Sequence, residues 1–359
     1  MNKSILLAHF PKISARKHRQ LLSTFSSVEA AWQAGLPELM KLGWEENFAH
    51  EFLLWKSEVN EEKIGKILEQ EKIHCVFADD AEYPPLLKEI YDPPFCLFVR
   101  GELKKISFPL AVVGPRAFSL YGKQVAEELV TELARRGLAI VSGLAIGIDG
   151  IAHEAALASN GRTIAVLGGG NDRQHVVPAG HRYVADKIIA GGGAVITEYP
   201  PGVMPTKYTF PRRNRIIAGM TLGTLVIEAG EESGSLITAQ CALDNGREVF
   251  AVPQNIHSPT AVGVNNLLKM GAKPVTSPAD ILDALNLRDV AEYVTNRAIL
   301  PDSPIEAKLL EHLSREPLHV DQLTKRSSLD SPTVNSALTI MEMKGKVRNI
   351  GGMMYVLAH

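Results

Sequence analysis

The chain has 359 residues, of which 45% are hydrophobic and 22% are charged, and its formal net charge is −2. This length allows two or three domains with full hydrophobic cores, and the balanced charge excludes a globally basic surface. If the protein binds nucleic acid, it does so through local patches. Its three cysteines lack paired metal-ligand spacing, so we expect neither a disulfide framework nor a metal, and we expect no cofactor. The N-terminal apolar run is too short for a signal peptide and no stretch reaches about 18 apolar residues, so we expect a cytoplasmic protein without membrane contact.

Residues 1–62 carry helical spacing in short pieces at 15–25, 28–32, 36–42 and 44–56, with Gly35 and Gly43 between them. This pattern predicts a small helical module of the kind that includes SAM and helix-hairpin-helix units. Two uses remain open for it, a protein-interacting or stabilising cap and a contact to the DNA backbone.

Residues 63–288 alternate between short apolar strands and helical segments. After a helix from Lys63 and an extended, proline-rich lead-in at 83–101, helices such as 119–136 and 150–158 separate the strands. We predict strands at 110–113, 139–141, 163–167, 194–197, 224–227, 248–252 and 274–276. Continuous apolar strands joined by crossover helices indicate an α/β domain with a doubly wound, mostly parallel, Rossmann-like sheet.

The C-terminal part is expected to be a separate unit. A linker is predicted at 289–304, and residues 305–359 are expected to form a winged helix. Its predicted elements are helices at 305–313, 320–325 and 332–344 and a hairpin at 346–356. The third helix has one Asn and no Arg, so we expect protein contact or weak DNA contact from it.

Cationic side chains gather between Glu198 and Glu228, where the only formally charged residues are Lys207, Arg212, Arg213 and Arg215. Arg212 and Arg215 share one face of a predicted short helix. The turn at 233–235 (SGS) then opens a second helix, whose N-terminal amides favour an anion. A cationic cluster beside an amide-rich turn suits the phosphates of single-stranded nucleic acid.

Glycine-rich loops follow several of the predicted strands. They include 113–116 with Arg116, 142–147 with Ser142 and Gly143, and 168–170. Ligands of doubly wound sheets bind outside the carboxyl ends of the strands, so we expect these loops to converge on one binding edge together with the arginines.

Common enzymatic signatures are missing: the dinucleotide fingerprint, the P-loop and the nucleophile elbow do not occur at the required spacing. Asp149 and His153 are four residues apart on a helix, which would suit a metal or an acid/base pair, but with no third ligand we interpret them as a helix-start Asp and a packed His. Glu228 and Glu231 are expected to position the arginines by hydrogen bonds, with a catalytic role as the alternative.

The motifs together resemble the DprA/Smf family of bacterial DNA-processing proteins. The similar segments are 112–122 (VVGPRAFSLYG), 142–153 (SGLAIGIDGIAH), 168–170 (GGG), 198–202 (EYPPG), 210–219 (FPRRNRIIAG), 233–239 (SGSLITA) and 246–253 (GREVFAVP). This resemblance implies a non-enzymatic protein that binds single-stranded DNA, forms a homodimer through its Rossmann-like domain and helps to load RecA onto DNA, including DNA taken up in natural transformation. The predicted DNA contacts are Arg116, Ser142, Gly143, Lys207, Arg212, Arg213, Asn214, Arg215, Ser233, Gly234 and Ser235. The predicted dimer or partner contacts are Leu267, Leu268 and Met270.

The chain departs from the family pattern in three places. The loop at 171–178 (NDRQHVVP) is two residues longer than usual and lacks a tyrosine, which puts the carry-over to Arg182 in doubt. Gln254 and Pro115 also replace the usual residues. Two alternative functions remain open at this point: a nucleotide-processing enzyme of the phosphoribohydrolase type, and a regulator that senses a nucleotide and reports through the winged helix.

Overall fold

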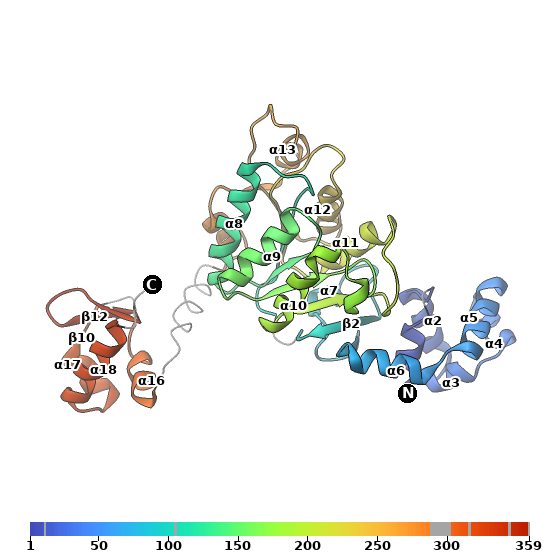
Figure 1. Cartoon of the computed structure of the whole chain (residues 1–359), viewed down its shortest axis with the longest axis horizontal. Helices are drawn as coiled ribbons and strands as arrows, with labels where there is room; N and C mark the ends of the chain where they lie inside the picture. The colour runs from blue at the N-terminus through green and yellow to red at the C-terminus, as the bar shows by residue number, and fades with distance from the viewer. Residues whose placement is uncertain (11, 104–105, 288–302, 315–316, 344–345, 358–359) are drawn as a thin grey trace. The chain divides into compact units, whose positions relative to one another are not determined.

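The computed structural model describes residues 1–10, 12–103, 106–287, 303–314, 317–343 and 346–357 (Figure 1). The described chain forms two compact units, Met1–Ile281 and Leu282–His359. No helix in these described ranges is long and apolar enough to cross a bilayer.

The first unit begins with a helical module that has its own aromatic core. Its helices are α1 (Lys3–Ala8), α2 (Ala15–Thr24), α3 (Val28–Gln33), α4 (Leu36–Lys41), α5 (Glu46–Glu58) and α6 (Glu61–Gln70). Side chains of Asn2, Ser14 and Ser27 cap α1, α2 and α3, which explains why such short helices begin where they do. Phe52 lies at the centre, with its ring edge-on to Trp44.

This module packs onto the sheet domain and does not stand alone. Ala8 joins a small core with Ile73 and Phe98, and the His18 ring stacks on Phe95 at 4.3 Å between centroids. The boundary expected at residues 62 and 63 is therefore not a boundary between compact units, because Met1–Ile281 forms one unit.

A nine-stranded sheet forms the centre of the first unit in the described chain, in the order β1-β2-β6-β5-β4-β3-β7-β8-β9. Its strands are β1 (Ile73–Phe77), β2 (Cys96–Gly101), β3 (Leu110–Val113), β4 (Ile140–Ser142), β5 (Thr163–Val166), β6 (Ala194–Thr197), β7 (Gly223–Val226), β8 (Glu248–Ala251) and β9 (Lys273–Pro274). The neighbouring strands β6-β5-β4-β3-β7-β8-β9 all run parallel to one another, whereas β2 runs antiparallel to both β1 and β6. The predicted doubly wound, mostly parallel α/β fold is confirmed.

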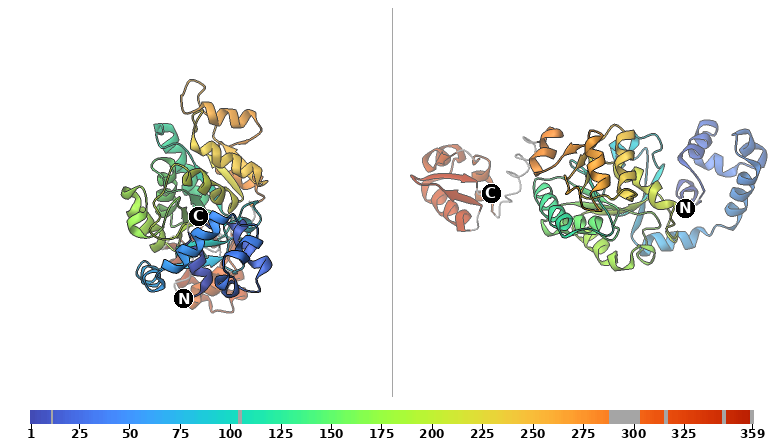
Figure 2. Two further views of the ribbon diagram at one scale, coloured as in Figure 1. Left: turned by 90° about the vertical axis from the view of Figure 1, so that its right-hand side faces the viewer. Right: turned by 90° about the horizontal axis from the view of Figure 1, so that it is seen from above.

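Helices cover both faces of this sheet (Figure 2). They are α7 (Pro85–Lys88), α8 (Leu120–Arg135), α9 (Ile148–Ala158), α10 (Arg182–Ala190), α11 (Thr209–Gly219), α12 (Gly234–Asp244), α13 (Val262–Lys269) and α14 (Pro278–Ala284). Helices α8, α9 and α10 pack side by side, and α11 packs against α12. All four residues of β3 are buried because the strand is covered on both sides.

The chain order reverses beside β3. Strands β4, β5 and β6 extend the sheet in one direction, and the crossover through α11 then places β7, β8 and β9 in the other. The carboxyl ends of β3 and β7 thus flank a topological switch point, which is where open α/β sheets form their ligand crevice.

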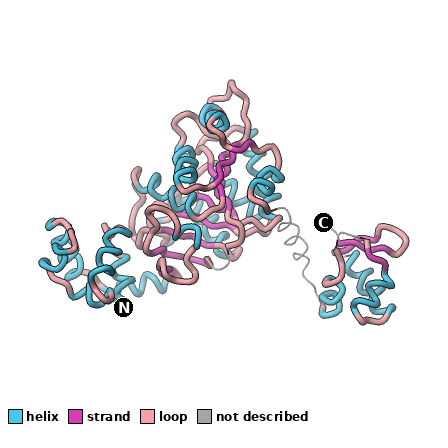
Figure 3. Tube along the Cα trace, turned by 180° about the vertical axis from the view of Figure 1, so that it is seen from behind, coloured by secondary structure: helices cyan, strands magenta, loops and turns pink. Residues whose placement is uncertain are grey.

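The second unit is a winged helix, as expected (Figure 3). It contains α16 (Pro304–Leu310), β10 (Leu318–His319), α17 (Val320–Ser327), α18 (Ser331–Met343), β11 (Val347–Asn349) and β12 (Met354–Leu357). Most of the linker predicted at 289–304 lies outside the described residues. Helix α18 exposes the uncharged residues Asn335, Ser336, Thr339 and Ile340 and the acidic residue Glu342. Protein contact or weak DNA contact through this helix stays a prediction.

Candidate nucleic-acid interface

A cleft of about 520 Å³ opens at the switch point. Four segments line it: Gly114–Arg116 after β3, the β4–α9 loop at Ala145, the first turns of α11, and the turn at Ser233–Ser235 before α12. The predicted convergence of loops on one sheet edge is therefore correct for these segments.

Arg116 is the exposed cation of this cleft. Its guanidinium carbon lies 5.7 Å from the centre of the Phe210 ring, which also lines the cleft. Phe210 belongs to the motif at 210–219 but was not among the predicted site residues. An aromatic residue directly before Pro211 at a helix start is the signal that could have identified it, because a ring held there faces the same edge as the helix N-terminus.

The N-terminus of α12 also opens into the cleft. The Ser233 side chain caps the helix by accepting from the Ser235 amide at 3.4 Å, and the two hydroxyl oxygens are 2.7 Å apart. No heavy atom lies within 4 Å of the position that a Cβ would take at Gly234, so this glycine leaves the helix end uncovered. The partial positive charge of that end favours an anion in the cleft.

Ser142, Gly143 and Arg213 are buried, and Arg213 is also one of the residues that line the cleft; their predicted contact with DNA stays a prediction. The buried Ser142 hydroxyl donates to the Val112 carbonyl at 2.7 Å. The Gly143 amide donates to Asp149 Oδ2 at 3.1 Å, and its carbonyl accepts from Arg213 Nη1 at 2.8 Å. All three residues are buried and already hydrogen-bonded within the protein, so a strand in the cleft would have to displace these bonds to reach them.

The buried guanidinium of Arg213 ties α11 to the sheet. It also donates to the Val166 carbonyl at the end of β5 and to Asn214 Oδ1, while Asn214 donates to the Gly234 carbonyl at 3.3 Å. Gly143 is required beside it, because a Cβ there would lie 2.4 Å from the Arg213 nitrogens. Burial lowers the pKa of Arg213 to about 10, and nearby Asp149 opposes that shift, so the guanidinium stays charged at neutral pH.

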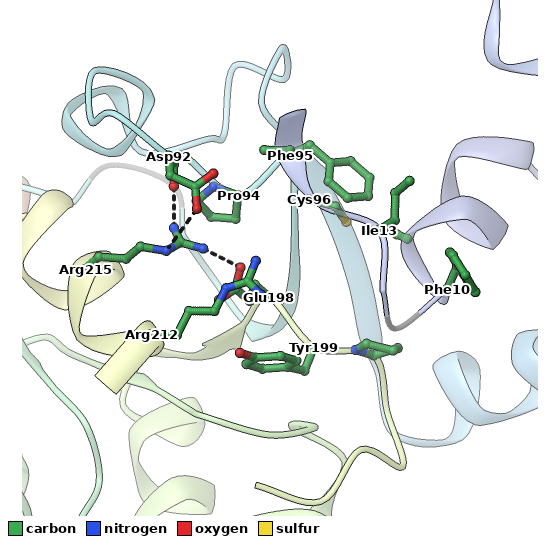
Figure 4. Close-up of a pocket in the computed structure, with 13 residues that line it drawn as sticks. Phe10, Ile13, Asp92, Pro94, Phe95, Cys96, Glu198, Tyr199, Arg212 and Arg215 are labelled. Atoms are coloured by element: carbon green, nitrogen blue, oxygen red, sulfur yellow. Dashed lines mark hydrogen bonds and ion pairs between the residues drawn. The ribbon is translucent and has the colours of Figure 1, made fainter. Parts of the chain in front are cut away.

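Arg212 and Arg215 line a second pocket, in which both guanidinium groups lie at Glu198 (Figure 4). Arg215 is 14% exposed and binds the Asp92 carbonyl and the Glu198 carboxylate, whereas Arg212 is 47% exposed with Nε 3.5 Å from Glu198 Oε1. Arg116 therefore lines the cleft, whereas Arg212 and Arg215 line the second pocket, and their predicted contacts with one DNA strand stay a prediction. Their three-residue spacing does place Arg212 and Arg215 together, on Glu198.

The glutamates also differ from expectation. Glu198, and not Glu228 or Glu231, holds the arginines. Glu228 is fully buried and accepts from both the amide and the hydroxyl of Ser119 at the start of α8. A carboxylate in this position stabilises the helix N-terminus and is not accessible to a substrate.

Asp149 and His153 have structural roles, as interpreted from the sequence. Asp149 is in the first turn of α9, and burial raises the pKa of its carboxyl group. His153 is fully buried with Nδ1 2.7 Å from Thr163 Oγ1, and burial lowers its pKa to about 3. Within the described ranges, no group of three His, Cys, Asp or Glu residues could hold a metal ion.

The remaining predicted contacts lie on the surface with one exception. Lys207 is exposed in the loop before α11, with its Nζ 5.1 Å from the Tyr208 ring centre. On α13, Leu267 is part of the buried core and Leu268 is partly buried, whereas Met270, just beyond the helix, is 72% exposed. The predicted partner contacts of these three residues stay a prediction.

Comparison with known proteins agrees with this architecture. Residues 74–286 match the family model of the DNA recombination-mediator protein A, and residues 295–353 match that of the DprA winged helix domain. Protein Smf of Escherichia coli is 44% identical over 292 residues, which cover 79% of this chain and 78% of that protein. The DNA processing protein DprA of Bacillus subtilis is 44% identical over 223 residues, which cover 62% and 74% of the two chains.

Solved structures show the same relationship. The DprA structure from Streptococcus pneumoniae aligns with a TM-score of 0.69 at 36% identity, over 79% of this chain and 97% of that one. A DprA structure from Helicobacter pylori, described for its single-stranded DNA binding mode, aligns with a TM-score of 0.54 at 29% identity, over 61% and 98%. The chain belongs to the DprA/Smf family of DNA recombination mediators.

Proposed function

We propose that this protein binds single-stranded DNA in the cleft at the switch point and presents it to RecA as a recombination mediator. The observation that carries the proposal is the exposed Arg116 guanidinium above the Phe210 ring, beside the uncovered N-terminus of α12. The relative from Helicobacter pylori, which binds single-stranded DNA, supports the same ligand class.

Each part of the cleft has a task in this proposal. Arg116 and the α12 N-terminus at Gly234 attract the phosphates, and exposed Lys207 lies in the loop leading to α11. Phe210 in the cleft and exposed Tyr208 next to Lys207 supply rings on which unpaired bases stack. A duplex keeps its bases stacked on one another, so it cannot use these rings and binds more weakly.

The proposal includes no catalytic step. Of the two carboxylates considered for the phosphoribohydrolase alternative, Glu228 is buried under Ser119, and Glu231 is exposed but is not among the residues that line the cleft. We also propose that the protein acts in the cytoplasm as a homodimer during uptake and recombination of DNA. The exposed Met270 beyond α13 is the residue best placed among the predicted partner contacts to join a second copy or RecA.

The test is fluorescence anisotropy with labelled single-stranded and duplex oligonucleotides at several salt concentrations. We expect Arg116→Ala to weaken single-strand binding about tenfold or more and to reduce the salt slope by about 0.7, the value for one phosphate contact on a single strand. Arg136→Ala is the matched control, because Arg136 is a half-exposed arginine just past the far end of α8 and pairs with Glu132. Equal binding by the two variants would contradict the proposed site.

RecA delivery and dimerisation need separate measurements. We expect the wild-type protein to accelerate RecA filament growth on single strands coated with a single-strand-binding protein, followed by RecA ATP hydrolysis. Light scattering measures the mass in solution, where a dimer is expected. Met270→Glu should reduce one or both readouts without changing the affinity for DNA, and a variant that leaves both unchanged would remove Met270 from the interface.

A further inference from the structure

A second cationic and aromatic surface lies beyond the cleft, at the start of α10. We call it the α10 patch and define it as Arg173, Arg182, Tyr183 and Lys187. These residues come from the 171–182 segment, in which this chain is longer than the usual family pattern, and from the first turns of α10. A shallow groove of about 560 Å³ runs over Arg173, Arg182 and Tyr183 and is also lined by Gln174 and by the carboxylate residue Glu71, while Lys187 lies outside the lining.

Tyr183 provides an exposed stacking platform in this groove. Its side chain is 61% exposed, and Lys187 Nζ, one helical turn further on, lies 4.3 Å from the ring centre. The lysine lies over the ring, and the exposed part of the Tyr183 side chain is open to a planar group. A ring with a cation at its edge or face is the arrangement that single-strand-binding proteins use for a base and its phosphate.

Contacts within the protein hold the two arginines in place. Arg182 donates to the carbonyls of Gln174 and Val176, and these neutral acceptors orient its guanidinium without cancelling its charge. Arg173 pairs with Asp186 at 3.1 Å, yet its side chain is 64% exposed. Preordered guanidinium groups lose little side-chain entropy when a phosphate binds.

Contacts within the protein connect the α10 patch to the cleft. Ala145 and Asp149 line the cleft. His181, directly before Arg182, has Nδ1 2.9 Å from the carbonyl of Leu144 and packs against Gly150, so its ring lies against the same loop. Figure 1 shows α9 and α10 as neighbours in the sheet domain. The protein surface therefore runs from the cleft, across the β4–α9 loop, to the patch.

We propose that the α10 patch is a second contact surface for the same DNA strand, which leaves the cleft across the β4–α9 loop and stacks a base on Tyr183. This inference rests on the proposed function. It adds that strands long enough to reach the patch bind more tightly than strands that fill only the cleft, and that this gain depends on Tyr183 and Lys187.

The experiment compares an oligothymidine of about 6 nucleotides with one of about 20, a range that spans the usual site sizes of single-strand-binding grooves. For the long strand, Tyr183→Ala should weaken binding about tenfold, the loss expected for one base stacked on an aromatic ring. Lys187→Gln should lower the salt slope for the long strand by about 0.7. Both variants should bind the short strand as the wild type does.

Matched controls separate the patch from general surface effects. Tyr183→Phe keeps the ring and should bind both strands as the wild type does. Lys273→Gln removes an exposed lysine from β9, an edge strand on the far side of β3 from α10, and should leave the long-strand salt slope unchanged.

The outcomes distinguish this inference from the proposed function. In one outcome, Arg116→Ala weakens the binding of both strands while Tyr183→Ala and Lys187→Gln change the binding of neither. In that case the cleft is supported and the α10 patch is overturned as a DNA contact. If Arg116→Ala has no effect on the short strand, the cleft itself is refuted. If Tyr183→Ala loses the tighter binding of the long strand and still binds the short strand as the wild type does, the α10 patch is supported.

Discussion

Arg213→Ala tests the claim that this arginine is a structural residue. In the folded protein its guanidinium donates to the carbonyls of Gly143 and Val166, at the carboxyl ends of β4 and β5, and to Asn214. It also stabilises the charged form of Asp149, whose pKa is raised by burial. The substitution leaves buried carbonyls without a donor and an acidic side chain without its nearby cation.

The expected loss is large for a single substitution. Removing one partner of a buried charge pair costs about 3–5 kcal/mol, and each buried carbonyl left without a hydrogen bond costs about 1–3 kcal/mol. These contributions overlap because the site relaxes, so we expect the free energy of unfolding to fall by about 3–5 kcal/mol. Arg212→Ala is the control one residue away: Arg212 is half exposed, and its pair with Glu198 is expected to contribute about 0–1 kcal/mol.

Urea unfolding followed by tryptophan fluorescence is the assay, since Trp32, Trp44 and Trp55 all belong to the unit Met1–Ile281. The midpoint and the slope together give the free energy of unfolding for each variant. If Arg213→Ala and Arg212→Ala differ by less than about 0.5 kcal/mol, the range of ordinary surface substitutions, the structural role is refuted.

Two further predictions concern buried ionisable groups. Burial lowers the pKa of His153 to about 3 from its ordinary 6.5, so the unfolded chain takes up a proton in this window that the folded chain does not. The contribution of His153 to the free energy of unfolding is therefore complete above pH 6.5 and falls by about 1.4 kcal/mol per pH unit as the pH drops towards 3. His153→Gln should remove this part of the pH dependence. Urea midpoints that change in parallel for the wild type and the variant across this pH range would contradict the prediction. Glu228→Gln should lower the free energy of unfolding by about 1–2 kcal/mol, because it removes the negative charge that accepts from Ser119 at the start of α8, and an unchanged melting temperature would contradict that role.

The sheet was predictable from the sequence because a strand buried on both faces must be apolar along its whole length. Leu110–Val113 and Ala194–Thr197 have this character and appear at the predicted positions. The short helices α1 and α7 were not predicted: α1 lies in the N-terminal apolar run that was considered only as a signal peptide, and the four residues of α7 are too few to show helical periodicity. The attachment of the helical module to the sheet domain was also missed, because it depends on small contacts such as Ala8 against Phe98.

By itself, the sequence determined the fold class, the family and the loops that meet at the binding edge, since these follow from local patterns and ordered motifs. Only the tertiary structure decided which cations face the cleft. Helical spacing placed Arg212 and Arg215 on one face and Arg213 on another, but it could not tell which face would meet the sheet. The lack of a side chain at Gly143 leaves room for the Arg213 guanidinium at the ends of β4 and β5, where Arg213 lines the cleft together with Arg116, whereas Arg212 and Arg215 pair with Glu198.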